Sequence, residues 1–166
     1  MNPLDFSMPA SLATLSDLQR LISEIERVDS RLGDMKIHQQ IGHPVGNDLI
    51  FSKQLVEFLE LNNIDINDAG IRGQLLIGVR QLKNTVPVVH VTFAAAAEHE
   101  ELAKFVDWVR QSVHPQAVLT VGLQPDLIGG AYVRTTNKVF DMSIRTQLAS
   151  GRQIIKQDLE ALSGAV

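Results

Sequence analysis

The chain has 166 residues, enough for one ordinary domain or two small ones, and its 45% hydrophobic and 20% charged residues are typical of a globular protein. A formal net charge of −4 argues against a nucleic-acid partner, because non-specific binding to nucleic acid needs a basic surface. The absence of cysteine excludes a disulfide framework, a thiolate nucleophile and a cysteine-ligated metal site.

The sequence also argues against direct insertion into a membrane. No apolar run approaches the roughly 20 residues that a helix needs to cross a bilayer. Residues 1–15 have no basic region and contain Asp5, so neither a secretory signal nor an arginine-rich transit peptide is expected. If the protein acts at a membrane, its partners must hold it there.

Residues 1–14 have the composition of a loose leader, and a first helix is expected to follow. Ser16 and Gln19 have the spacing of a capping box, which predicts the start of this helix. Apolar residues then recur at intervals of three and four, which predicts one apolar helix face. That face consists of Leu18, Leu21, Ile22, Ile25, Val28, Leu32 and Met35. It is either the buried side of a simple bundle helix or, in part, a surface that receives a partner helix.

Two further helices are predicted in the first half of the chain. Glycine and proline within 42–46 break the first helix, and a second is expected over about 52–62. Its inward-facing residues should be Leu55, Val56, Phe58 and Leu59. A third helix is expected over about 68–83, with Asp68 as its N-cap. Residues 1–85 are therefore predicted to form an N-terminal helical domain.

After residue 85 the apolar pattern changes from the helical period to the alternation of β-strands. Strands are predicted over 88–93 and 117–123, with a helix between them, and a β-hairpin and a C-terminal helix from about Ile144 follow. The predicted fold class is α+β: an all-helical segment, in the form of a reduced bundle, precedes a small β-α-β-β-β-α domain over 86–166.

The stretch 125–148 carries the densest set of local signals. A proline-aspartate turn opens it, and the pair Gly129–Gly130 then marks a bulge, a bend or a close approach of two backbones. Asn137 suits the tight turn of a hairpin, and Ser143 is a suitable N-cap for the last helix. Turn, strand, turn, strand and helix start therefore follow one another within a short segment.

This segment resembles the C-terminal signature of the delta subunit of F-type ATP synthases, whose mitochondrial counterpart is the oligomycin-sensitivity-conferring protein. The signature reads roughly Leu-Ile-Gly-Gly, aliphatic-x-Val-Arg/Lys, a polar turn, and then Val-x-Asp-Gly-Ser-aliphatic-Arg-x-x-Leu. The matching residues are Leu127, Ile128, Gly129, Gly130, Val133, Arg134, Val139, Asp141, Ser143, Ile144, Arg145 and Leu148. Met142 departs from the glycine of the signature, which bears only on the local turn geometry.

The resemblance implies a non-catalytic subunit of the peripheral stalk of a proton-translocating ATP synthase. In that family the N-terminal helical domain binds the N-terminal helix of the alpha subunit, and the C-terminal domain binds the C-terminal helices of the b subunit. The implied location is the bacterial cytoplasm, at the inner face of the cell membrane. The family's N-terminal bundle has more helices than the three or four found here, so its head-binding face does not transfer residue by residue.

The residues themselves offer no chemistry that would contradict a binding role. The five histidines lack zinc-ligand spacing, and Gly129–Gly130 lacks the Gly-x-x-x-x-Gly-Lys-Ser/Thr pattern of a phosphate loop. No Gly-x-Ser-x-Gly nucleophile elbow is present. We therefore expect no catalytic residue, no cofactor and no metal. The alternatives are a small α+β ligand-binding domain or enzyme, and a stand-alone protein-interaction adaptor.

Three helices carry the candidate residues for partner interfaces. Trp108 is the only tryptophan; its plainer interpretation is core packing, and the alternative is an interface anchor, because tryptophan is enriched at binding hot spots. The candidates are Leu18, Leu21, Ile25 and Val28 on the first helix, Phe105 and Trp108 on the helix between the first two strands, and Ile155 and Leu159 on the terminal helix.

Overall fold

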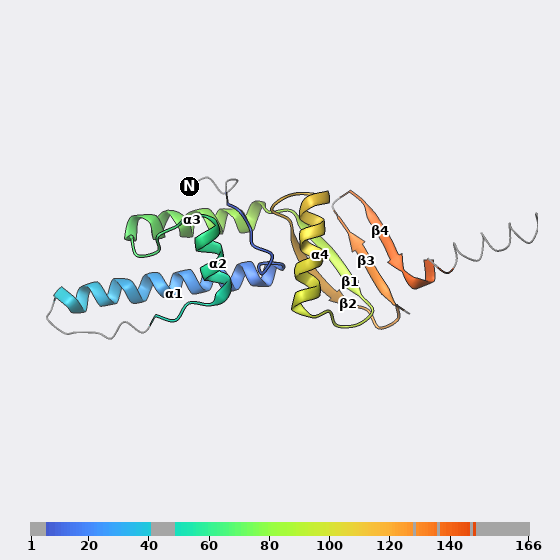
Figure 1. Ribbon diagram of the computed structural model, residues 1–166, viewed down its shortest axis with the longest axis horizontal. Coiled ribbons are helices and arrows are strands. Elements are labelled where there is room, and N and C mark those ends of the chain that lie inside the picture. Colours follow the sequence, from blue (N-terminus) through green and yellow to red (C-terminus); the bar gives the residue numbers. More distant parts are fainter. Residues whose placement is uncertain (1–5, 41–48, 128, 136, 147, 149–166) are drawn as a thin grey trace, which may run out of the picture. The chain divides into compact units, whose positions relative to one another are not determined.

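The computed structural model describes residues 6–40, 49–127, 129–135, 137–146 and 148, and it has the predicted α+β class (Figure 1). The helices are α1 (Leu15–Gln40), α2 (Lys53–Leu61), α3 (Ala69–Thr85) and α4 (His99–Ser112). The strands are β1 (Val88–Phe93), β2 (Val118–Leu123), β3 (Gly130–Arg134) and β4 (Val139–Ser143). Three helices therefore precede the strand-containing half, and one helix lies between the first two strands, as the sequence patterns predict.

The chain divides into two compact units. One consists of 1–87 together with 99–118, and the other of 88–98 together with 119–166. The first, the helical unit, contains α1, α2, α3 and also α4; the second, the sheet unit, contains most of the sheet. This grouping differs from a simple division of the sequence at residues 85 and 86, and the two predicted domains stay a prediction.

The capping box of α1 lies two residues earlier than the predicted pair of Ser16 and Gln19. The amide of Thr14 donates to Asp17 Oδ2 (2.9 Å), and the amide of Asp17 donates back to Thr14 Oγ1 (3.1 Å). Arg20 donates to the other carboxylate oxygen of Asp17 (2.7 Å). Asp17 takes the role predicted for Gln19, because a carboxylate at a helix N-terminus accepts hydrogen bonds from amides and also interacts favourably with the positive end of the helix dipole.

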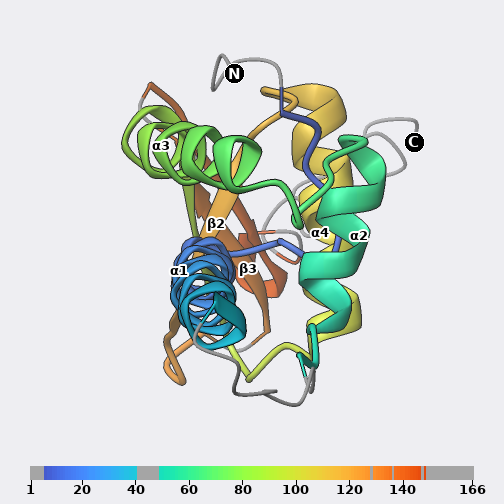
Figure 2. The same ribbon diagram turned by 90° about the vertical axis from the view of Figure 1, so that its left-hand side faces the viewer.

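The core of the helical unit follows the apolar periodicity. Helix α1 contacts both α2 and α3, and Figure 2 looks along α1 with the other two beside it. Asp68 caps α3 as predicted, accepting from the amides of Gly70 (2.7 Å) and Ile71 (3.0 Å), and these bonds lower the pKa of Asp68. Val56 was expected to face inward but is 37% exposed, because Leu55, Phe58 and Leu59 already supply the buried face of α2.

A buried arginine joins three segments of the helical unit. The side chain of Arg72, on α3, is only 2% exposed, and its Nε donates to Asp29 Oδ1 of α1 (2.7 Å). Its Nη1 donates to the backbone carbonyls of Ile66 (3.0 Å) and Asn67 (2.9 Å), in the loop between α2 and α3. A buried guanidinium is tolerated because an acid and two carbonyls satisfy it.

A second arginine attaches the N-terminal segment, which was expected to be a loose leader. From α4, Arg110 donates to the carbonyls of Met8 (3.0 Å), Pro9 (2.9 Å) and Leu12 (2.7 Å). Burial lowers the pKa of Arg110, and the nearby carboxylate of Asp107 opposes this effect. The expectation of a leader is therefore wrong for residues 6–14.

Apolar contacts reinforce this attachment. Phe6 is buried and its ring lies 5.6 Å from the ring of Phe58 on α2, centroid to centroid. The side-chain Nε2 of Gln116, after α4, donates to the Phe6 carbonyl (2.9 Å). Leu12 is fully buried as well. The N-terminal segment thus packs into the helical unit through both its backbone and its side chains.

The four strands form one sheet in the order β2-β1-β3-β4. Strands β1 and β3 are antiparallel, as are β3 and β4. Along β2 and β1, the amide of Val118 donates to the carbonyl of Pro87 and the amide of Gln124 to that of Phe93. The two strands therefore run in the same direction, as a parallel pair. The alternation of side chains gives the central strands one buried face, formed by Val89, Val91, Ala131 and Val133. The opposite face carries His90, Thr92, Tyr132 and Arg134.

We predict that Arg110→Met lowers the free energy of unfolding by roughly 1–3 kcal/mol, the cost of leaving buried backbone acceptors without a donor. The N-terminal segment should also become sensitive to limited proteolysis, since its carbonyls lose their partner. Urea denaturation and protease digestion measure the two effects. Arg31→Met, at an exposed position of α1, is the matched control and should change neither. Equal midpoints for the two variants would contradict the proposed anchoring role.

Candidate functional site

The segment that carries the family signature is built around Gly130, the first residue of β3. Its φ is +87°, a conformation that residues with a Cβ rarely adopt. An added Cβ would also press against the backbone carbonyl of Met142 and lie 3.0 Å from Ser143 Cα on β4. At Gly129 an added Cβ would instead meet the flexible end of the Ile144 side chain. The two glycines therefore differ: Gly130 permits a close approach of two backbones.

The start of the last helix is organised by Asp141, Ser143 and Thr146. The Ser143 amide donates to Asp141 Oδ1 (2.9 Å), and the Thr146 hydroxyl donates to Asp141 Oδ2 (2.8 Å). The Thr146 amide donates to Ser143 Oγ (3.4 Å), which confirms Ser143 as the N-cap. Hydrogen bonds from Ser143 and then Thr146 hold the pKa of Asp141 below its ordinary value. The ionised Asp141 therefore stabilises the fold at neutral pH, and this stabilisation is lost as the pH falls through its folded-state pKa.

The remaining signature residues are divided between the interior and the surface. Val133 is buried in the sheet, and Leu127 is half-buried. Arg134, Arg145 and Leu148 are exposed, and Ile128 lies outside the described residues. The signature thus encodes a turn, a close backbone crossing and a helix cap, and nothing in its described part resembles a catalytic arrangement.

The described residues hold neither a cluster of metal-binding side chains nor a membrane-spanning helix. In the part of the chain that the structure describes, no three His, Cys, Asp or Glu side chains gather as a metal ion would require. Within the same residues, no helix is long and apolar enough to span a bilayer.

The candidate interface residues of α1 lie in the interior of the helical unit. Leu18, Leu21, Ile25 and Val28 are all buried. Their burial favours the interpretation of this stripe as the inner face of a bundle helix. A partner contact through these four side chains stays a prediction, and a contact by the isolated folded chain has to use other atoms.

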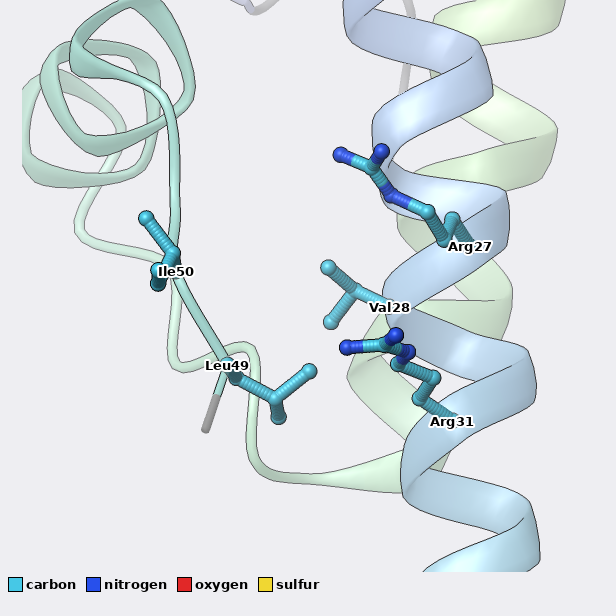
Figure 3. Close-up of a pocket in the computed structure, with 5 residues that line it drawn as sticks. All are labelled: Arg27, Val28, Arg31, Leu49 and Ile50. Atoms are coloured by element: carbon cyan, nitrogen blue, oxygen red, sulfur yellow. The ribbon is translucent and has the colours of Figure 1, made fainter. Parts of the chain in front are cut away.

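The surface beside this stripe forms a groove that the sequence did not reveal. It encloses about 320 Å³ and is lined by Arg27, Val28 and Arg31 of α1 and by Leu49 and Ile50 of the segment before α2. Figure 3 shows the two arginines projecting from α1 toward that segment. We call these five residues the α1 groove. In the sequence, Arg27 and Arg31 lie on the polar side of α1, opposite its apolar stripe. Leu49 and Ile50 do not belong to a helical pattern of apolar residues, so nothing in the sequence links them to the two arginines.

A contact between α1 and the start of α2 holds the groove in shape. Glu24 on α1 accepts a hydrogen bond from the amide of Ser52 (2.7 Å), the residue that caps α2. Ser52 follows Leu49 and Ile50 closely, so this bond holds their segment near α1. Ile50 is nevertheless 88% exposed, which leaves a large aliphatic side chain at the rim of the groove.

The second candidate surface lies on α4. Trp108 is 47% exposed and its ring lies 5.6 Å from the ring of Phe105, which is half-buried. Core packing therefore accounts for Phe105 better than for Trp108. Ile155 and Leu159, the candidates on the terminal helix, lie outside the described residues. Whether either pair contacts a partner stays a prediction.

Comparison with known proteins identifies the family. The family model for the ATP synthase delta (OSCP) subunit matches residues 71–155, about half of the chain. The chain belongs to the ATP synthase delta (OSCP) subunit family. The match begins in α3 and includes α4 and all four strands, whereas α1, α2 and the α1 groove lie outside it.

Individual relatives agree with this assignment. The chain is 34% identical over 101 residues to the ATP synthase subunit delta of Gloeothece citriformis (strain PCC 7424), covering 60% of this chain and 50% of that protein. The delta subunit of Picosynechococcus sp. is 33% identical over 76 residues, covering 45% and 41%, and that of Myxococcus xanthus is 34% identical over 68 residues, covering 41% and 37%. The chain thus matches about half or less of the length of these relatives.

The geometry predicts that the two adjacent glycines respond differently to substitution. Gly130→Ala should lower the free energy of unfolding by about 1–3 kcal/mol, because it imposes both an unfavourable φ and a backbone collision. Gly129→Ala is the matched control and should cost clearly less, since only the Ile144 side chain has to move. Chemical denaturation of both variants measures the difference. Equal losses would show that the close backbone crossing does not limit stability.

Proposed function

We propose that this chain is a non-catalytic peripheral-stalk subunit, a stator, of a proton-translocating F-type ATP synthase, linking the catalytic head to the b-subunit stalk. The observation that carries the proposal is the family match over residues 71–155, which includes the whole sheet and its connecting helix. Family membership fits the sequence analysis, which finds no phosphate loop, no nucleophile elbow and no metal-ligand spacing.

The physical task of such a subunit is to resist torque. Rotation of the central stalk would turn the catalytic head unless a static connection held the head to the membrane-anchored part of the complex. A binding protein can supply this connection without chemistry, provided that its complexes dissociate slowly. Slow dissociation requires large apolar or planar side chains that become buried on binding.

For the head contact, the α1 groove is the part of the helical unit that best fits an amphipathic helix. Leu49 and Ile50 provide apolar surface beside the buried Val28, and Arg27 and Arg31 provide two cationic groups next to it. An amphipathic helix docks by placing its apolar face into such a groove. The proposed occupant is the N-terminal helix of the alpha subunit, whose acidic side chains would lie against the two arginines.

For the stalk contact, the exposed ring of Trp108 on α4 is the best anchor among the residues that the structure describes. A half-exposed tryptophan loses a large apolar area from water when a partner covers it, and tryptophan is enriched among binding hot spots. The proposed occupants are the C-terminal helices of the b subunit, with Ile155 and Leu159 as further candidate contacts. The complex would lie at the inner face of a bacterial cell membrane, in the cytoplasm, with no cofactor bound to this subunit.

A co-purification experiment tests the proposed function as a whole. When the tagged chain is expressed in the organism that it comes from and purified, the alpha, beta and b subunits of ATP synthase should co-purify with it. The purified chain alone should neither synthesise nor hydrolyse ATP. Recovery without any ATP synthase subunit, or ATP turnover that disappears when one of its own residues is substituted, would contradict a stator role.

Two substitutions should separate the two contacts. Ile50→Asp should weaken binding to a peptide of the alpha-subunit N-terminus while leaving b-subunit binding unchanged, because it places a charge at the rim of the α1 groove. Trp108→Ala should have the opposite selectivity. We expect each loss to be tenfold or more, the scale of a hot-spot residue. Titration calorimetry with the full chain measures both affinities.

Matched controls keep this experiment informative about binding rather than folding. Ile77→Asp alters an α3 side chain that is 66% exposed and outside the α1 groove, and Val113→Ala shortens an exposed side chain just after α4. Neither should change either affinity. Ile25 is unsuitable for this purpose, because it is fully buried and its substitution would test stability. If Ile50→Asp binds the alpha peptide as Ile77→Asp does, the α1 groove is the wrong surface.

A further inference from the structure

The polar face of the sheet contains a second hollow, which the proposed stator function does not use. It encloses about 700 Å³ and lies within the sheet unit, over β1 and β3. Its polar lining includes His90 and Thr92 from β1, Tyr132 and Arg134 from β3, and Gln124, which directly follows β2. A volume of several hundred Å³ is the size of an ordinary small-molecule site.

The strand register brings the two nitrogen-rich side chains together. His90 lies directly opposite Arg134 in the antiparallel pair, and Thr92 lies opposite Tyr132. Directly opposed residues on one face have Cβ atoms about 5 Å apart. Val89, Val91 and Val133 face the other way and are buried, so the direction of the polar side chains is fixed by the core. The side chains of His90 and Arg134 therefore leave the sheet from directly opposed positions on the same face.

These polar side chains have no internal partners within the described part of the chain. Arg134 takes part in no ion pair there, and no hydrogen bond engages the side chains of His90, Tyr132 or Gln124. No acidic residue lines the hollow. A guanidinium on the residue opposite a histidine, in a hollow that no carboxylate lines, offers hydrogen-bond donors to an anion.

The charged groups nearby favour an anion at one end of the hollow. Asp141 on β4 lies opposite Tyr132, but its carboxylate already accepts hydrogen bonds from Ser143 and Thr146. Lys138 lies in the turn after Arg134, where its amide donates to the hydroxyl of Thr135. The end that contains His90 and Arg134 is therefore the more positive, and the end near Asp141 is better suited to a neutral group.

We propose that this face binds a nucleotide, with its phosphates between His90 and Arg134 and its base stacked on Tyr132. Tyr132 and Arg134 are two residues apart on one face of a strand, which separates them by about 7 Å and matches the division of a nucleotide into phosphate and base. Aromatic side chains stack readily on nucleobases. An extended acidic peptide fits less well, because its carboxylates are spaced along a chain, whereas the hollow is lined by a single guanidinium, that of Arg134.

The test is a titration of the full chain with ATP, followed by backbone amide NMR signals and by calorimetry. Saturable binding should perturb residues of β1 and β3, and Arg134→Gln should weaken it at least tenfold, as expected when a charge-assisted bond to phosphate is lost. Arg134→Lys should retain part of the affinity, because it keeps the charge and loses the planar fork. Arg145→Gln, at an exposed arginine outside the hollow, is the matched control and should bind like the unmodified chain.

Two further ligands test whether the site recognises the base as well as the phosphates. Tripolyphosphate should bind more weakly than ATP, and Tyr132→Ala should remove that difference by removing the stacking surface. A glutamate-rich peptide should not compete with ATP. The proposal is overturned if ATP produces no saturable change, if tripolyphosphate binds as tightly as ATP, if the acidic peptide binds in its place, or if Arg134→Gln binds as tightly as Arg145→Gln.

Discussion

The helical unit depends on the guanidinium of Arg110. It satisfies three carbonyls of the N-terminal segment, at Met8, Pro9 and Leu12, and it also donates to the carbonyl of Ala117 after its own helix (3.1 Å). Residues about a hundred positions apart in the chain are thereby connected through one side chain. An arginine suits this position because its planar group presents five donors, whereas a lysine would offer one flexible ammonium. The position of α4 within the helical unit, rather than with the strands on either side of it, follows from this connection.

Arg72 plays a comparable part between α1 and α3, and the two arginines explain much of what the sequence could not reveal. From sequence alone, an arginine in a helix is expected to lie at the surface, since burying an unpaired guanidinium has a large free-energy cost. Its burial becomes favourable only when distant partners meet it, here Asp29 and the carbonyls of Ile66 and Asn67. Those partners are defined by the tertiary fold. No pattern of local spacing in the sequence could have identified them.

Features that depend on neighbours in the chain were predictable. The caps at Asp68 and Ser143 rest on contacts within three residues, and the alternation of β1 is visible in the order of its own side chains. The start of α1 was misplaced because Thr14–Asp17 and Ser16–Gln19 have the same spacing, although Asp17 offers a carboxylate that the side chain of Gln19 lacks. For the candidate sites, the apolar stripe of α1 could be found but its burial could not. The α1 groove requires the segment at Leu49 and Ile50 to lie across the helix, which is again a tertiary fact.

Exposed apolar residues are common on protein surfaces and do not by themselves indicate a partner. Ile77 is such a residue, exposed on α3 and outside the α1 groove. What distinguishes Ile50 is its combination with Val28, Leu49 and two arginines, because a partner helix could then bury apolar area and pair charges in the same step. The polar face of the sheet differs, because its hollow is lined mostly by polar side chains, with the guanidinium of Arg134 on the residue opposite His90. A helix that covered it would leave His90 and Arg134 unsolvated unless it brought anions to them, so a small anionic ligand is the occupant that costs least.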